Sequence, residues 1–119
     1  MYSAELLKHF QDSSKVGDVH KATVAVESQN PVCGDVLRLS LRVDAGVITE
    51  VRFRAKGCVP AIACGARLAD LLQGLTVQKA ADLNSDTIET EVGGLPEASK
   101  HAAALAIQTL RSALKSIPR

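Results

Sequence analysis

The chain has 119 residues, of which 46% are hydrophobic and only 3% aromatic, and its formal net charge at pH 7 is +1. This length predicts one domain, residues 1–119, with an aliphatic core, and the small net charge gives no reason to expect nucleic acid or a membrane as a partner. No apolar run approaches the roughly 18 residues of a membrane-spanning helix. The N-terminus lacks the basic-then-apolar order of a signal peptide, and three cysteines are an odd number for a disulfide framework. We therefore expect a cytoplasmic protein whose thiols are free or bind a ligand.

The N-terminal part of the chain predicts a helix, a polar loop and a strand. Residues 3–10 form a short helix with Ser3 as its N-cap, and its apolar side consists of Leu6, Leu7 and Phe10. Residues 11–21 are polar and contain a glycine, which favours a loop. The β-branched stretch 22–26 is typical of a strand.

The clearest pattern in the chain is a β-hairpin that turns at residues 44–46. Apolar and polar side chains alternate on both sides of this turn, which predicts one buried face and one wet face. The buried face consists of Leu37, Leu39, Leu41, Val43, Thr49, Val51, Phe53 and Ala55. The wet face carries Arg38, Arg42, Glu50, Arg52, Arg54 and Lys56. Because this basic face has no aromatic side chains for base stacking, we interpret it as a solvated face and not as an RNA-binding one.

The C-terminal half predicts mostly helices. A helix opens at Pro60 and runs to about Gln73, with an inner stripe of Ala61, Ile62, Gly65, Leu68, Ala69 and Leu72. Residues 76–83 form a shorter helix capped by Thr76, and residues 84–94 form a loop with at most one helical turn. A last helix starts at residue 96 or 99, and its stripe is Ala103, Ile107, Leu110, Leu114 and Ile117. This order predicts an α+β fold, with a three-stranded antiparallel sheet and helices packed on one face.

Four side chains with the chemistry of metal ligands lie at the ends of the predicted elements. Cys33 and Asp35 are in phase with Leu37, so both point to the covered side if the strand begins that early. Cys58 lies just before the helix at Pro60, where backbone N–H groups and the macrodipole favour a thiolate. His101 lies at the start of the last helix. Two thiols, a carboxylate and an imidazole are a plausible tetrahedral ligand set for zinc or iron.

Each of these residues also has an ordinary structural interpretation. A free cysteine is usually a small buried hydrophobe, and Asn30, Pro31 and Gly34 account for a turn around Cys33. His101 is nine residues before Leu110, about 180° around a helix, which predicts a histidine facing solvent. Only its place at a helix end keeps it among the ligands.

Cys64 is predicted to be a packing residue. It follows Cys58 by six residues, about 9 Å along a helix and about 120° around it. Two thiolates on one zinc ion must lie near 4 Å apart, so a regular helix prevents these two from sharing an ion.

The motifs Pro31-Val32-Cys33-Gly34-Asp35-Val36 and Lys56-Gly57-Cys58, with Leu95-Pro96 and His101 further on, resemble the IscU/NifU N-terminal family of iron–sulfur cluster assembly scaffolds. The resemblance runs nearly end to end. It implies a protein that is not an enzyme itself, binds iron and assembles a [2Fe–2S] cluster. It also implies partners: a cysteine desulfurase that supplies sulfur, an iron donor, and apo-proteins that receive the cluster. The family's ligands carry over to Cys33, Asp35, Cys58 and His101.

Two positions depart from the family pattern. The family's third cysteine follows the histidine, and Ala102 stands there in this chain. A methyl group cannot replace a thiolate, the usual ligand of a cluster. The family's Leu-Pro-Pro-Val-Lys chaperone motif reads Leu95-Pro96-Glu97-Ala98-Ser99, which makes recognition by a dedicated chaperone doubtful.

Three hypotheses follow from these residues. The first is a scaffold that binds iron or a cluster, with reduced competence because the third thiol is missing. The second is a regulatory or accessory module that holds zinc or iron without assembling clusters, and zinc is the expected occupant of the isolated protein. The third is a thiol enzyme with Cys58 as nucleophile and His101 as base.

Overall fold

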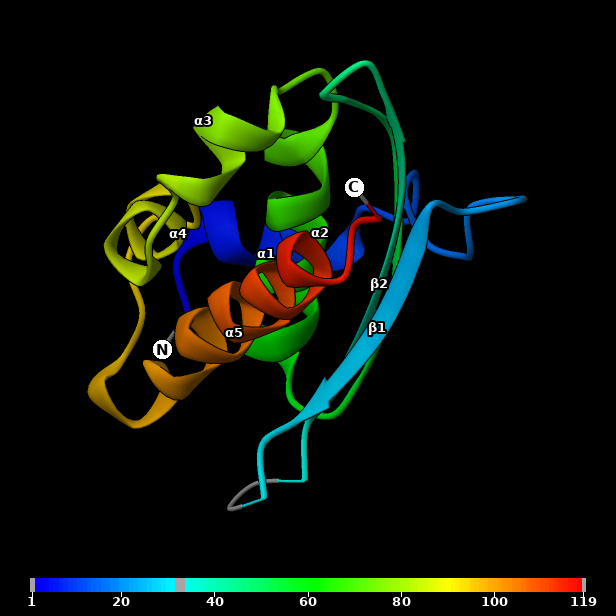
Figure 1. The fold of residues 1–119 in the computed structure, drawn as a ribbon. Coiled ribbons are helices and arrows are strands. Elements are labelled where there is room, and N and C mark those ends of the chain that lie inside the picture. Colours follow the sequence, from blue (N-terminus) through cyan, green and yellow to red (C-terminus); the bar gives the residue numbers. More distant parts are fainter. Residues whose placement is uncertain (1, 32–33, 119) are drawn as a thin grey trace.

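The structure is a computed structural model and describes residues 2–31 and 34–118. Three strands form one antiparallel sheet in the order β1-β2-β3: β1 (Val24–Gln29), β2 (Val36–Asp44) and β3 (Val47–Lys56). The helices lie on one face of this sheet, as Figure 1 shows. They are α1 (Ala4–Gln11), α2 (Val59–Leu72), α3 (Val77–Ala81), α4 (Ser85–Glu91) and α5 (His101–Lys115), with a 3₁₀ turn η1 (Glu97–Ser99) before the last. The predicted α+β class is confirmed.

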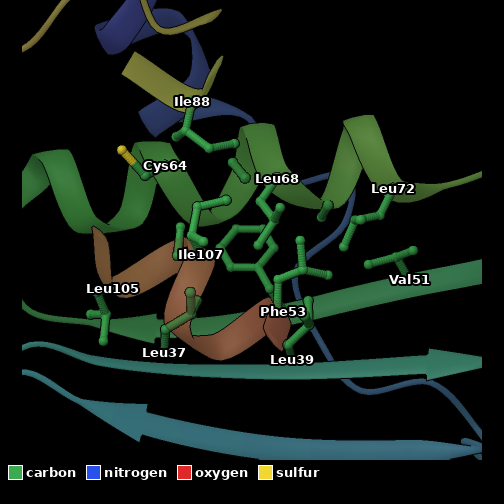
Figure 2. Packing of buried hydrophobic residues seen from close by; sticks show 14 of the residues in the cluster. Leu37, Leu39, Val51, Phe53, Cys64, Leu68, Leu72, Ile88, Leu105 and Ile107 are labelled. Atoms are coloured by element: carbon green, nitrogen blue, oxygen red, sulfur yellow. The ribbon is translucent and has the colours of Figure 1, made fainter. Parts of the chain in front are cut away.

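Helix α2 occupies the centre of the core, packed against β3 on one side and against α1, α4 and α5 around it. Figure 2 shows Leu37 and Phe53 of the sheet lying beneath this helix. A Cβ on Gly65 would lie 2.9 Å from Leu37 Cδ1, so the glycine permits the close approach of helix and sheet. The predicted inner stripe is too narrow, since Ala63, Cys64 and Ala66 are also buried while Ile62 is half-buried. Neighbours on several sides explain why small alanines fill this helix.

The hairpin is confirmed, but one position on its buried face is wrong. The register of β2 and β3 shifts between Arg42 and Val43: Arg42 pairs with Glu50 and Val43 with Ile48. The extra residue on β3 is Thr49, which is therefore exposed, and Ile48 takes its place in the core. A bulge of this kind adds one residue to one strand and reverses the alternation beyond it.

Two predictions near the N-terminus also need correction. Strand β1 runs from Val24 to Gln29, later than the predicted 22–26, because Glu27 to Gln29 still pair with β2. Helix α1 has the predicted cap, with Ser3 Oγ accepting from the Leu6 N–H at 3.0 Å. Leu7, however, is 42% exposed, because α1 buries Leu6 and His9, which are three residues apart on one face.

The loop before β1 crosses the wet face of the sheet. The segment Lys15–Gly17 exchanges backbone hydrogen bonds with Phe53, and Ser40 Oγ accepts from the Val19 N–H at 2.9 Å. Asp18 accepts from Arg38 and Arg54, both at 2.9 Å, and these hydrogen bonds lower the pKa of its carboxyl. Glu50 pairs in turn with the two other arginines of this face, Arg42 and Arg52. The four arginines of the wet face therefore have counter-ions within the chain.

The stretch 84–94, predicted to be a loop, contains helix α4. The Asn84 side chain caps it by accepting from the Thr87 N–H at 3.0 Å. Ile88 and Val92, four residues apart, are fully buried in an otherwise polar stretch, and the helix packs against α5 and α2. None of the helices in the described part of the chain combines the length and hydropathy needed to cross a membrane.

Candidate metal centre

Asp35 immediately precedes β2, and the fold buries it to 2% exposure. Its backbone carbonyl accepts from the Asn30 N–H at 2.8 Å, which ties the end of β1 to the start of β2. Its carboxylate Oδ1 accepts from the backbone N–H of Cys58 at 2.9 Å. Cys58 is the N-cap residue of α2 and makes no side-chain capping bond itself. Asp35 thus fixes the first turn of α2 from a neighbouring strand.

Three of the predicted ligands come together in the fold. The second carboxylate oxygen of Asp35, Oδ2, lies 3.3 Å from Cys58 Sγ and 3.3 Å from His101 Nε2. One ligand atom from each residue lies within 4.8 Å of the others. Bonds of about 2.0–2.3 Å to one tetrahedral ion place neighbouring ligand atoms about 3.3–3.8 Å apart. The two separations from Asp35 Oδ2, 3.3 Å each, therefore suit a single tetrahedral ion with sulfur, oxygen and nitrogen donors.

His101 faces this cluster and not bulk solvent, so the helical-face prediction for it was wrong. Its side chain is 30% exposed, and its Nε2 atom is buried without a hydrogen-bond partner among the described residues. The 3.3 Å approach to Asp35 lacks hydrogen-bond geometry. His101 lies on the same helix face as Leu105, which is one turn later and buried. The sequence prediction compared the direction of the His101 side chain only with that of Leu110, nine residues away. A buried nitrogen that lacks a hydrogen-bond partner among the described residues, beside a carboxylate and a thiol, fits a metal ligand.

The other predicted positions fall outside this cluster. Cys33 lies outside the described residues, so its part in the ligand set stays a prediction. Cys64 is fully buried, and burial raises the pKa of its thiol to about 12. Figure 2 shows its sulfur on the side of α2 away from the sheet. Ala102, at the position of the absent third thiol, is 1% exposed. The full burial of Cys64 and the raised pKa of its thiol fit its interpretation as a packing residue.

Gly57 has a structural role at the centre that sequence reasoning did not identify. A Cβ at this position would lie 2.0 Å from Asp35 Oδ1, and the backbone φ of +134° disfavours a side chain as well. The glycine therefore makes room for the carboxylate between β2 and α2. The available signal was a glycine directly before a cysteine at a strand-to-helix junction, since glycine is common where a polar group approaches the backbone closely.

Replacing Gly57 with alanine is expected to destabilise the fold more than replacing Gly17 with alanine. Gly17 has nearly the same φ, +138°, but no described heavy atom lies within 4 Å of the place that a Cβ would occupy there. In both variants backbone strain is expected to lower the free energy of unfolding by on the order of 1–3 kcal/mol. Gly57→Ala also displaces Asp35 from the Cys58 N–H, a charge-assisted hydrogen bond of about 1.5–3 kcal/mol. Urea unfolding measures the difference, and equal losses in the two variants would show that Asp35 is not held by this contact.

Comparisons with known proteins agree with these observations. The family model for the NifU-like N terminal domain matches residues 1–119. The chain is 34% identical over 116 residues to the iron-sulfur cluster assembly scaffold protein IscU of Aquifex aeolicus, covering 96% of this chain and 74% of that protein. It is 35% identical over 120 residues to the iron sulfur cluster assembly protein 1, mitochondrial, of Debaryomyces hansenii, covering 97% of this chain and 66% of that protein.

A solved structure has the same fold. The putative iron-sulfur cluster assembly scaffold protein for the SUF system from Fervidobacterium islandicum superposes with a TM-score of 0.78 at 21% identity. The superposition covers 95% of this chain and 96% of that one. At this identity the likeness concerns the arrangement of helices and strands.

Proposed function

This chain belongs to the family of NifU-like N-terminal domains, as its motifs predicted, and from that premise we propose that it is a scaffold for iron–sulfur cluster assembly. The observation that carries the proposal is the convergence of Asp35, Cys58 and His101, which offer ligand atoms within 4.8 Å of one another. Cys33 joins them in the proposal because it precedes Asp35 by two residues. The cargo is iron or a [2Fe–2S] cluster. The cytoplasmic location stays a prediction, since a relative is named mitochondrial.

The donor set suits a cluster that is held and then released. Thiolates bind iron–sulfur clusters most strongly, and clusters with two cysteine and two histidine ligands are also known. Cys58 and Cys33 would supply the two thiolates, with His101 and Asp35 as harder nitrogen and oxygen donors. In the proposal, sulfur comes from a cysteine desulfurase, iron comes from a donor, and apo-proteins receive the cluster. The chain itself performs no turnover chemistry.

Anaerobic reconstitution tests this function directly. The purified protein is incubated with ferrous iron and sulfide, desalted, and examined by visible absorption and by iron and sulfide analysis. The expected result is a stable charge-transfer band with equal amounts of iron and acid-labile sulfide. A protein that returns colourless and retains neither iron nor sulfide would refute the scaffold function.

A metal-binding accessory module is the second candidate, and the buried methyl group of Ala102 favours it. With one thiol fewer than the family pattern, the centre would hold a single zinc or iron ion without building a cluster. Reconstitution would then give protein with bound metal but no sulfide. This outcome separates the module from the scaffold.

Zinc is expected to stabilise the isolated protein if the centre binds it. Ligands from three separate segments converge only in the folded state, so binding adds to the free energy of unfolding. At a free zinc concentration of about 100 times the dissociation constant, the gain is about 2.7 kcal/mol, which for a domain of this size raises the melting temperature by roughly 10 °C. Thermal melts with zinc and with a chelator measure the shift. His101→Ala should remove most of it, and a shift that persists in this variant would place the zinc elsewhere.

A further inference from the structure

A pocket of about 590 Å³ lies between the start of α4 and the C-terminal part of α5, two helices that pack against each other. Asn84 and Ser85 form one wall, and six residues of α5 between Ala104 and Lys115 form the other. The volume is within the range of about 300–1,000 Å³ that is usual for small-molecule sites. None of the three residues of the candidate metal centre lines this cavity, which we call the α4–α5 pocket.

The charged side chains of the α4–α5 pocket are two cations without a counter-ion. Arg111 and Lys115 are exposed, and neither forms an ion pair with any residue that the structure describes. No aspartate or glutamate is among the described residues that line the pocket. The two cations are four positions apart on one face of α5, where side chains lie about 5–6 Å apart and like charges repel slightly. One anionic group can therefore contact both cations and remove the repulsion between them.

The neutral polar side chains of the pocket offer further hydrogen-bond donors. Asn84 Oδ1 accepts from the Thr87 N–H at 3.0 Å and from Thr87 Oγ1 at 3.2 Å, which leaves the amide N–H₂ group of Asn84 for another partner. Ser85, Gln108 and Ser112 make no side-chain hydrogen bond within the described part of the chain. The pocket therefore suits a ligand that is anionic and rich in hydrogen-bond acceptors.

We propose that the α4–α5 pocket binds a small organic phosphate monoester, either a sugar phosphate or a nucleoside monophosphate. Such a phosphate carries a charge of about −1.5 to −2 at pH 7 and three strong acceptor oxygens, which match the two cations and the donors around them. The planar guanidinium of Arg111 can donate two parallel hydrogen bonds to it. The organic part would lie against Ala104 and Ile107, the apolar side chains of the same wall.

The surroundings of the pocket favour a small ligand over a polyanion. Asp82 and Asp86 are exposed and flank Asn84 and Ser85 in the sequence. A nucleic acid strand or an acidic protein segment is longer than the pocket and would extend over these carboxylates, which repel it. A small ester can keep its phosphate at the opposite wall, where the cations are.

Titrations of the full-length, metal-free protein test the ligand class. Amide chemical shifts are followed by NMR at low ionic strength, because salt screens exposed cations. The esters are glucose-6-phosphate and AMP, and the controls are glucose, adenosine, inorganic phosphate and succinate. We expect at least one ester to bind with a dissociation constant below about 1 mM and at least about fivefold more tightly than every control. The ester that binds more tightly distinguishes a sugar phosphate from a nucleotide, and the shifts should centre on Ser85, Gln108 and Ser112.

Charge variants test the location. Arg111→Gln/Lys115→Gln should weaken ester binding about tenfold or more. The matched control Lys8→Gln/Lys21→Gln removes two exposed cations outside the pocket and should change the dissociation constant less than about twofold. Of the single variants, Arg111→Gln should have the larger effect, because Lys115 lies in the last turn of α5, whose carbonyl groups already attract its charge. All four positions are exposed, so the variants should fold, and circular dichroism checks this.

Three results would overturn the proposal. The first is that neither ester binds below about 1 mM, or that inorganic phosphate or succinate binds as tightly as both esters, which would indicate a non-selective anion patch. The second is an equal loss of binding in the two double variants. The third is tighter binding of a glutamate-rich peptide or of single-stranded DNA, which would indicate a macromolecular partner. The inference does not depend on the proposed scaffold function, since the assay contains no iron or sulfide.

Discussion

Replacing Cys58 with serine is expected to abolish cluster retention while leaving the fold intact. A serine hydroxyl does not ionise near neutral pH and is a poor ligand for iron–sulfur clusters, so the visible absorbance after reconstitution should fall to about a tenth of wild type or less. The helix should tolerate the change, because Cys58 occupies the N-cap position of α2 and makes no capping bond, and serine is a preferred N-cap residue. Visible absorption after anaerobic reconstitution measures cluster retention, and urea unfolding measures the stability of the fold.

Cys64→Ala is the matched control for this experiment. It also removes one thiol from the chain, but from a fully buried site whose thiol keeps its proton, since burial raises its pKa to about 12. The control is expected to lose some stability, because the surrounding core loses contacts, and to keep its cluster. If Cys58→Ser retained the wild-type absorbance, Cys58 would not be a ligand and the proposed centre would be wrong.

The sequence predicts the sheet because its signals are local. Leu37, Leu39 and Leu41 alternate with polar residues, and the turn at residues 44–46 needs no distant contact to be identified. The helix caps Ser3 and Thr76 are also local, and both accept the expected backbone hydrogen bonds. Local periodicity and capping chemistry therefore account for most of the fold.

The features that the sequence could not give depend on contacts between distant segments. The bulge at Thr49 is visible only from the pairing of β2 with β3, and α4 is stable because Ile88 packs against other helices. The orientation of His101 depends on where α5 crosses the start of β2, since the helix alone offers several faces. Asp35 was predicted correctly to be buried, but its hydrogen bond to the Cys58 N–H joins residues 23 positions apart.

Replacing Ala102 with cysteine is expected to lengthen the cluster half-life several-fold after anaerobic reconstitution. Position 102 follows His101 and is the place where the family pattern has its third cysteine. A thiolate there would replace a weaker oxygen, nitrogen or solvent ligand with a soft sulfur donor, which iron–sulfur clusters favour. Visible absorbance followed over time measures the half-life.

Ala102→Ser separates the effect of the thiolate from the effect of added volume. Ala102 is 1% exposed, so either side chain enters a packed region and should destabilise the metal-free protein by about 1–3 kcal/mol. Only the cysteine can recover that loss by binding iron. The cysteine variant should therefore melt earlier than wild type without a cluster and keep its cluster longer, whereas the serine variant should show only the earlier melting.

The opposite pattern would identify a different third ligand. If Ala102→Cys left the half-life unchanged and Cys64→Ala abolished the cluster, Cys64 would be the missing thiolate. That outcome would require α2 to open between residues 58 and 64, because an intact helix separates these positions by about 9 Å along its axis. It would also require the buried thiol, whose pKa is raised to about 12, to ionise as iron binds. Since α2 lies at the centre of the core, such an opening would expose much of the hydrophobic core to water. We therefore expect Ala102→Cys to change the cluster half-life more than Cys64→Ala does.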